Sequence, residues 1–198
     1  MMRIDSVGIS KLNKIKRLKL INSICGIRSV HLVGTKSYNG ISNLAIFSSI
    51  THLGSNPPLL GLISRPSTLV RRDTIKNILD TGTYTINSIE RNMLDRAHRT
   101  SGKFSRNVSE FDTCDFEEEI LANFSSPFVM ESEIKIGMKF IDSIHIQYND
   151  TYVIVGEIQL IHTKQSVVNH SESVGVIGLN DYYSTSKIKN LDYVRINT

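Results

Sequence analysis

The chain has 198 residues, which suits one domain that buries roughly 70% of the surface its unfolded form exposes. Hydrophobic residues make up 40% and charged residues 21%, a composition that argues against disorder and predicts an ordinary globular core. The net charge of +4 and the pI near 9.1 attract anions such as nucleotides weakly, and they do not by themselves indicate DNA binding.

Residues 1–24 are expected to form a basic helical segment that packs on the domain spanning residues 25–198. Cations and aliphatic residues alternate there at helical spacing, which predicts an amphipathic helix. Such a helix can also touch a membrane or nucleic acid, but this one has no aromatic anchor, and we expect neither partner. The cations are Lys11, Lys14, Lys16, Arg17 and Lys19, and the aliphatic residues are Leu12, Ile15, Leu18 and Ile21.

The two cysteines, Cys25 and Cys114, are far apart and form no CxxC motif, which indicates free thiols in a reducing compartment. No stretch approaches the roughly 18 apolar residues that a membrane span needs. The N-terminus also lacks the apolar core of a signal peptide. We therefore expect a cytoplasmic protein.

Residues 28–35 predict a first strand, and the Asn39-Gly40 turn joins it as a hairpin to a second apolar stretch. This stretch ends in hydroxyl residues at three of its last four positions, up to Thr51. We interpret it as a strand and an exit loop that present backbone and hydroxyl groups to a flat ligand. A third strand, residues 59–64, follows Pro57-Pro58, which exclude a helix there.

Two short helices are expected next. Asp73 or Thr74 caps the first, and Gly82 occupies the left-handed position at its end. Residues 83–87 return as a strand, and the second helix covers residues 89–98.

The second half begins with a long polar and basic connection, residues 99–110, which is typical of a functional loop. Acidic residues 112–119 are expected to form a surface loop with a helical turn. From residue 131 the pattern alternates as in strands and predicts a long hairpin that turns at Asn149-Asp150. Gly156 in mid-strand predicts a bulge where a barrel bends.

The sequence contains no clear motif for catalysis by side chains. The six histidines form no HExxH motif and no cluster with zinc spacing, and no Walker loop, GxGxxG or GxSxG motif is present. The carboxylates of residues 117–119 are expected to be a solvated face. An enzyme built on this chain therefore needs a cofactor for its chemistry.

An ordered set of motifs carries a family resemblance over roughly residues 25 to 165. Residues 178–183 also fit the pattern of that family. The set is Arg28…Gly34-Thr35, Ser42-Asn43-Leu44-Ala45-Ile46-Phe47-Ser48, Asn56-Pro57-Pro58-Leu59, Ser64-Arg65-Pro66, Asp73 to Ile78, Thr81 to Asn87, Ala97 to Phe104, Ser109-Glu110-Phe111 and Val155 to Ile158. The chain thereby resembles the flavin reductase-like proteins, of which flavoredoxin is one member.

The resemblance implies a mainly β fold, a Greek-key split β-barrel that binds FMN, with six or seven strands and short flanking helices. It also implies a homodimer that holds FMN near the subunit interface, NAD(P)H as hydride donor to flavin N5, and a downstream electron acceptor. Two alternatives stay open: a flavoredoxin-like electron carrier that does not oxidise NAD(P)H, and a non-enzymatic basic binding protein. The sequence does not choose between NADH and NADPH or between FMN as resident group and as substrate, and it leaves FAD possible.

The cofactor contacts that the resemblance implies fall into three groups. The second strand and its exit loop bring residues along the ring and ribityl chain, the end of the third strand and the turn after it bring residues to the ribityl or phosphate, and the polar loop brings a lysine to the phosphate. The groups are, in that order, Asn43, Leu44, Ala45, Ser48, Ser49, Ile50 and Thr51; then Ser64, Arg65, Arg71 and Thr74; then Lys103. Tyr38 and His98 complete the set as possible ring contacts, each against a structural role.

Elementary electrostatics gives these assignments a reason. A phosphate of about two negative charges needs cations and free N–H groups, which a basic loop and a helix N-terminus supply. Of the adjacent Arg71 and Arg72 we expect at most one to face the ligand. The sequence departs from the family at Ser29 and Ile46, where prolines are common, which puts the local backbone around the ring in question.

Overall fold

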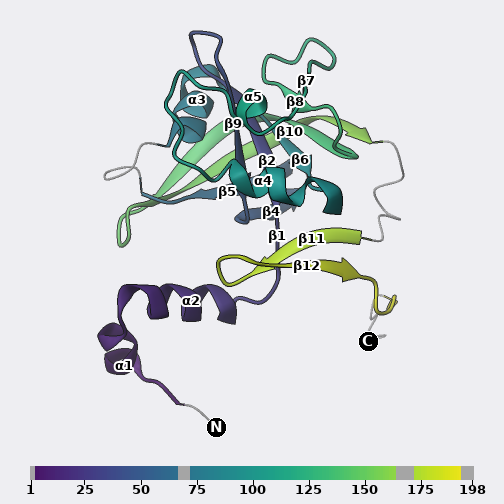
Figure 1. Cartoon of the computed structure of the whole chain (residues 1–198). Helices are drawn as coiled ribbons and strands as arrows, with labels where there is room; N and C mark the ends of the chain where they lie inside the picture. Colours follow the sequence, from purple (N-terminus) through teal and green to yellow (C-terminus); the bar gives the residue numbers. More distant parts are fainter. Residues whose placement is uncertain (1–2, 67–71, 164–171, 193–198) are drawn as a thin grey trace.

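The computed structural model describes residues 3–66, 72–163 and 172–192. Its centre is a seven-stranded antiparallel sheet in the order β3-β2-β6-β9-β10-β5-β4 (Figure 1). The strands are β2 (His31–Lys36), β3 (Ser42–Phe47), β4 (Ile50–Ser55), β5 (Pro58–Ser64), β6 (Thr83–Ser88), β9 (Ile134–Ile146) and β10 (Thr151–Thr163).

The sheet curls because its two edge strands are neighbours in the chain. β3 and β4 lie at opposite ends of the strand order, yet only Ser48 and Ser49 separate them. The described strands show no ladder between β3 and β4, so a chain connection brings the edges together. The result is the mainly β split barrel that the sequence predicts. We call residues Asn43 to Thr51, where the edges meet, the seam.

One apolar core fills the inside of the curled sheet. Its fully buried members come from β2, β5, β6, β9 and β10, and Phe47 and Ile50 pack against them from both sides of the seam. The core residues on the strands are Val33, Leu62, Tyr84, Ile86, Met138 and Ile154. Since a strand places alternate residues on opposite faces, this set confirms the alternating patterns read from the sequence.

A bulge at Gly156 helps the long β9–β10 hairpin to bend around this core, as predicted. The register between β9 and β10 shifts between Val155 and Gly156. A Cβ atom on residue 156 would lie 2.1 Å from the hydroxyl oxygen of Tyr84, so no side chain fits there. The Tyr84 hydroxyl is buried without a hydrogen-bond partner in the part of the chain that the structure describes, and burial raises its pKa.

Helix α3 (Asp73–Thr81) packs Ile75 and Ile78 against the inner core. Gly82 ends it in the left-handed conformation, with φ of 74°, as the sequence predicts. The cap prediction was wrong: Arg72 occupies the N-cap position and makes no side-chain cap hydrogen bond. Asp73 and Thr74 therefore lie inside the first turn.

A second core covers the outer face of β2 and β3. The region predicted as one helix is split into η1 (Arg91–Met93) and α4 (Leu94–Arg99), followed by α5 (Glu110–Thr113). Residues from these helices join Leu32 and Leu44 of the sheet in this core. Met93 is buried at the junction of η1 and α4.

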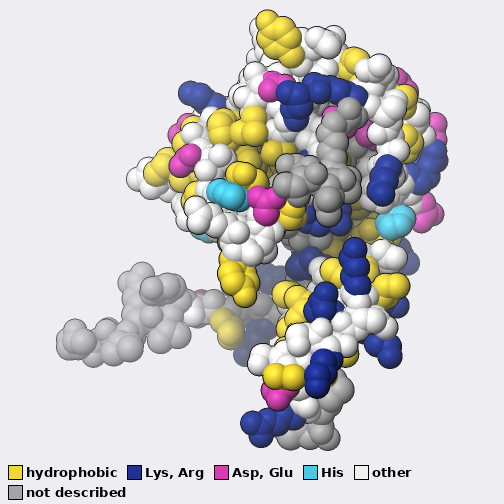
Figure 2. All heavy atoms as spheres, turned by 90° about the vertical axis from the view of Figure 1, so that its left-hand side faces the viewer, with side chains coloured by type: hydrophobic (Ala, Val, Ile, Leu, Met, Phe, Trp, Pro, Cys, Tyr) yellow, Lys and Arg dark blue, Asp and Glu magenta, His cyan; other side chains and the backbone are white. Residues whose placement is uncertain are grey.

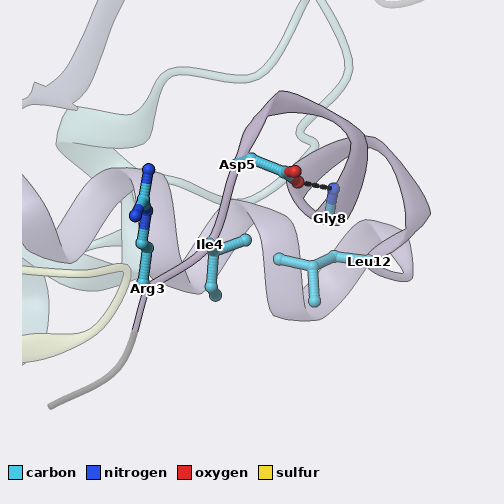
Figure 3. A pocket seen from close by; sticks show the side chains of 5 residues that line it. All are labelled: Arg3, Ile4, Asp5, Gly8 and Leu12. Carbon is cyan, nitrogen blue, oxygen red and sulfur yellow. Dashed lines mark hydrogen bonds between the residues drawn. The ribbon is translucent and has the colours of Figure 1, made fainter.

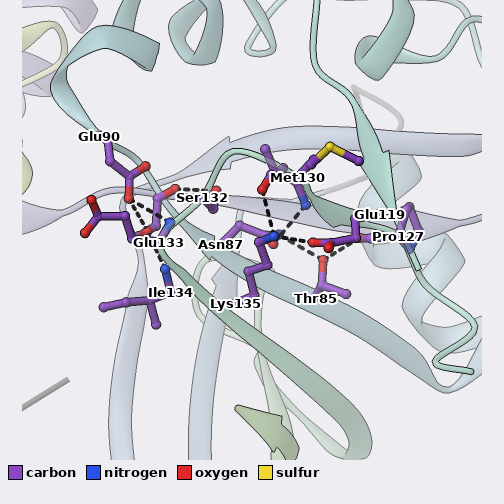
Figure 4. A network of polar contacts seen from close by, with 12 residues as sticks. Thr85, Asn87, Glu90, Glu119, Pro127, Met130, Ser132, Glu133, Ile134 and Lys135 are labelled. Carbon is purple, nitrogen blue, oxygen red and sulfur yellow. Dashed lines mark hydrogen bonds and ion pairs between the residues drawn. The ribbon is translucent and has the colours of Figure 1, made fainter. Parts of the chain in front are cut away.

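The segment between α5 and β9 lies across the barrel as a strap with two short strands, β7 (Glu118–Glu119) and β8 (Phe128–Val129). The Lys135 side chain is only 2% exposed; its ammonium pairs with Glu119 and donates to the Met130 carbonyl at 2.7 Å (Figure 4). Thr85 donates to the Pro127 carbonyl at 2.7 Å. Acidic residues 117–119 are thus only partly the solvated face that we expected, because Glu119 holds the strap.

Below the barrel lies a small sheet in the order β1-β11-β12, built from β1 (Arg28–Ser29), β11 (Glu172–Ile177) and β12 (Asp181–Ser186) (Figure 1). Helices α1 (Ser6–Lys11) and α2 (Lys14–Ile24) lie beside it. Neither helix contains a buried residue. The packing of the basic segment on the barrel stays a prediction.

Among the described residues, no helix combines the length and the apolar composition that crossing a membrane requires. Cys25 is exposed and Cys114 is buried, and both are free thiols.

Candidate functional site

The seam exposes the edges of two strands, which leaves backbone groups for a ligand. β3 has a neighbour only on its β2 side, and β4 only on its β5 side. Ala45, Ser48 and Ser49 give this stretch small side chains, all partly exposed. A flat ligand can approach such an edge closely.

The hydroxyl groups of the seam are divided between structural and free roles. Ser49 donates to the Ile63 carbonyl at 2.8 Å, and the Ile63 N–H donates back to the Ser49 carbonyl at 3.1 Å. This pair begins the β4–β5 ladder. Ser48 and Thr51 make no side-chain hydrogen bond within the described chain, so their hydroxyls remain available. The expected exit loop is wrong, since Ile50 and Thr51 belong to strand β4.

The N-terminus of α3 is tied to the seam through side chains. Asn43 Nδ2 donates to Thr74 Oγ1 at 3.1 Å, and Asn77 Nδ2 donates to Thr35 Oγ1 at the same distance. Because Thr74 accepts from Asn43, its own hydroxyl proton is left to donate elsewhere. The buried Asn77 Oδ1 has no partner.

Two arginines without an anion lie between the end of β5 and the start of α3. Burial, and then the charge of Arg65, lower the pKa of Arg72, so the two positive charges repel each other. Neither forms an ion pair within the described residues, and Arg72 Nε is buried without a hydrogen-bond partner among these residues. An unsatisfied buried donor is unfavourable, and a bound oxyanion would satisfy it. Ser64, at the end of β5, is buried and donates to the Arg65 carbonyl at 3.0 Å.

A buried carboxylate holds the outer side of β3. Glu110 of α5 accepts the Leu44 N–H at 3.0 Å. Burial raises the pKa of the Glu110 carboxyl, although the bond from Leu44 acts in the opposite direction. Leu44 is fully buried in the outer core. Its side chain and amide are thus both occupied, which leaves its carbonyl as the group for a ligand.

The remaining expected residues that the structure describes form no hydrogen bond or ion pair with this set. Tyr38 is 85% exposed in the turn between β2 and β3. His98 Nδ1 is 2.9 Å from the hydroxyl of Tyr182, and the two rings pack edge to face. Lys103 is exposed in the loop after α4 and forms no ion pair with a described residue. Arg71 lies outside the described residues.

The structure links several of the residues expected on β3, β4, β5 and α3, and their contacts with a cofactor stay a prediction. Sequence reasoning gave Arg72 no firm place and missed Glu110 as a support of the seam. The only signal for Arg72 was its position one residue before the helix. The expected flavin contact of His98 has a competitor in Tyr182.

A hollow of about 550 Å³ at the N-terminus is not part of this site (Figure 3). It is lined by Gly8 of α1 and by residues just before and after that helix, and Asp5 accepts the Gly8 N–H at 2.7 Å as the cap of α1. The hollow is largely open to solvent and presents no cluster of polar groups.

Comparisons with known proteins identify the family of the chain. The family model of the flavin reductase-like domain matches residues 27–178. The chain belongs to the flavin reductase-like family. The match spans both edge strands of the seam, α3, α5 and strand β11.

Solved structures support the family and the fold. A putative flavin reductase with a split barrel domain from Shewanella frigidimarina is 35% identical; the alignment covers 98% of this chain and 100% of that one, with a TM-score of 0.91. Flavoredoxin of Desulfovibrio vulgaris is 19% identical with a TM-score of 0.73, covering 85% of this chain and 92% of that one, and shows the fold alone. A protein of Aquifex aeolicus is 26% identical over 157 residues, 79% of each chain.

Proposed function

We propose that this flavin reductase-like protein is an oxidoreductase that binds FMN along the seam and accepts hydride from NAD(P)H. The observation that carries the proposal is the pair of unpaired arginines, Arg65 and Arg72, at the end of the seam region in a chain that belongs to this family. An FMN phosphate carries about two negative charges and fits these donors.

Two groups of residues contact the two ends of the cofactor, one at the phosphate and one at the ring. Arg65 and Arg72 bind the phosphate by charge-assisted hydrogen bonds, and the Thr74 hydroxyl donates a third bond. Helix α3 has nine residues, and its N-terminal N–H groups add a favourable field for the anion. Asp73 in the same turn opposes this field, so the arginines supply the main attraction.

The seam orients the ring. Ala45 and Ser48 leave room for a planar group beside the β3 edge, and the free hydroxyls of Ser48 and Thr51 are available for its polar rim. Glu110 keeps β3 in place by binding the Leu44 amide. When bound, the flavin supplies the redox chemistry, taking a hydride at N5. The chain therefore needs no acid or base of its own and acts by positioning two rings against each other.

The test is an absorbance titration under anaerobic conditions. Purified protein with bound FMN is mixed with NADH and, separately, with NADPH. Loss of the flavin band near about 450 nm within seconds supports hydride transfer to the bound cofactor. A band that persists with both nucleotides, while FMN stays bound, contradicts the reductase and leaves the electron carrier. Failure to bind FMN contradicts both.

A further inference from the structure

Helix α3 is tied to the sheet by two side-chain hydrogen bonds that run side by side. Asn43 of β3 donates to Thr74, and the bond measures 3.1 Å. Asn77 donates to Thr35 of β2 at the same distance. Thr35 and Asn43 are opposite each other in the β2–β3 ladder, and the two helix residues, three positions apart, share one face of α3. The helix therefore meets one pair of strands at two points, about 4.5 Å apart along its axis.

The bond from Asn77 is buried. Asn77 is 2% exposed, and Thr35 is fully buried. Figure 2 views the molecule from the side on which α3 lies, with lysine and arginine side chains on its upper surface; Asn77 lies beneath that surface. Its Oδ1 has no hydrogen-bond partner among the described residues, so the buried amide costs free energy that an apolar residue would not. A polar residue at such a place indicates a role in geometry rather than in stability.

The other contacts of α3 do not fix its rotation. Ile75 and Ile78 pack the helix on the inner core, and apolar contacts hold a helix close without a preferred direction. The ion pair of Lys76 with Asp80 lies within the helix. Arg72, at the N-cap position, makes no side-chain cap bond within the described chain. The two directional bonds to the sheet therefore set the rotation of α3 about its axis.

The rotation of α3 decides where its first turn presents groups to an anion. Arg72 and Thr74 lie at this end of the helix. A rotation by about 20° moves a group about 6 Å from the helix axis by about 2 Å. A charge-assisted hydrogen bond of about 2.8 Å does not survive that displacement. With only the bond between Asn43 and Thr74, the helix can turn about a single point, and the second bond, from Asn77, prevents this.

We propose that Asn77 is a positioning residue for the phosphate of the bound flavin. Its bond to Thr35 fixes the rotation of α3, and this rotation holds Arg72 and Thr74 toward the phosphate. Asn77 acts through these two residues and does not touch the flavin, because its amide is buried under the helix. This inference rests on the proposed function and adds to it a residue that lies outside the site.

The first experiment compares a single with a double replacement. Asn77→Leu keeps the branched shape of the side chain but leaves the buried Thr35 hydroxyl unpaired, so the midpoint of urea unfolding falls by about 0.5–1 M. Adding Thr35→Val removes the second partner as well and recovers most of that loss. The preference for FMN over riboflavin, measured as the ratio of their dissociation constants in fluorescence titrations, falls at least fivefold in both variants.

Ser132→Ala is the matched control. It removes a buried hydroxyl that donates to the Ser88 carbonyl at 2.8 Å, and it lowers the urea midpoint without changing the flavin preference. A double variant that regains both the stability and the wild-type preference overturns the proposal, because Asn77 is then only structural. A wild-type chain that binds FMN and riboflavin equally contradicts the proposed function and this inference with it. A wild-type preference that the double variant keeps contradicts this inference alone.

The second experiment asks whether Asn77 acts through Arg72. The pair Thr35→Val with Asn77→Leu is introduced into a chain that already carries Arg72→Ala. Because the arginine that the bond positions is then absent, the pair lowers the remaining preference for FMN by at most twofold, against at least fivefold in the wild-type background. A loss by the same factor in both backgrounds overturns the proposal, since the effect of Asn77 would then be independent of Arg72.

Discussion

At the scale of single residues, Arg72 is the side chain that most directly links the fold to a phosphate. Its Nε is buried without a partner, and its neighbour Arg65 repels it. We predict that Arg72→Ala weakens FMN binding at least tenfold, or about 1.4 kcal/mol, in a flavin fluorescence titration. Arg91→Ala, which removes an exposed arginine of η1, is the control and leaves the affinity unchanged. Equal affinities of both variants would remove Arg72 from the site.

The burial of His31 makes the stability of the fold depend on pH. Its Nδ1 is buried without a partner, and burial lowers the pKa of His31 from 6.5 to about 4. The unfolded chain therefore binds a proton more readily than the folded chain between these values, so stability falls as the pH falls through this window. From pH 7 to pH 4.5 this residue alone costs about 2 kcal/mol of unfolding free energy.

Replacing His31 by glutamine removes the titrating group. Urea unfolding of His31→Gln is expected to show a loss of stability between pH 7 and pH 4.5 that is smaller than in the wild type by about that amount. An identical loss in both proteins would mean that His31 is protonated as easily in the folded state as in the unfolded state.

At the scale of elements, the bulge at Gly156 in β10 depends on close packing against Tyr84 of β6. The Tyr84 hydroxyl occupies the place of a side chain at residue 156. We predict that Gly156→Ala lowers the unfolding free energy by about 1–3 kcal/mol through overpacking. Gly54→Ala in β4 is the matched control, because its added Cβ meets nothing closer than the Pro57 carbonyl at 3.4 Å.

The close approach of the Tyr84 hydroxyl to residue 156 also predicts that a second substitution restores part of the lost stability. Tyr84→Phe removes a hydroxyl that has no partner, so it is close to neutral alone, and it recovers part of the loss in the Gly156→Ala background. Chemical unfolding of the four proteins in this cycle measures the coupling. Strictly additive losses would show that the hydroxyl and residue 156 do not compete for space.

The sequence predicted the elements whose turns and alternating residues lie within one short stretch of the chain. The β2–β3 hairpin has its Asn-Gly turn, and the β9–β10 hairpin has its alternation and its bulge glycine. Strand β4 escaped prediction because its serine and glycine residues resemble a turn, and pairing with β5 decides its state. β1 pairs with β11, with Arg28 opposite Val176. A local sequence pattern does not predict a partner strand so far along the chain.

At the scale of the whole molecule, the ordered motifs located the seam, although they could not resolve the details around it. Two adjacent arginines look alike in sequence, and the choice of Arg72 rests on its buried Nε. For His98 the sequence left a flavin contact and a structural role open, and the fold places Tyr182 beside it. The basic N-terminal segment was expected to pack on the barrel, and its exposure followed only from the structure.

The central claim is that the chain binds FMN through its phosphate, at the arginines beside the seam. Riboflavin is the same molecule without that phosphate. The most direct measurement is therefore a pair of flavin fluorescence titrations of the full chain, with FMN and with riboflavin, at low and high salt. The account predicts that FMN binds at least tenfold more tightly, about 1.4 kcal/mol, and that salt reduces the difference. Equal affinity for the two flavins, or no binding of either, would contradict it.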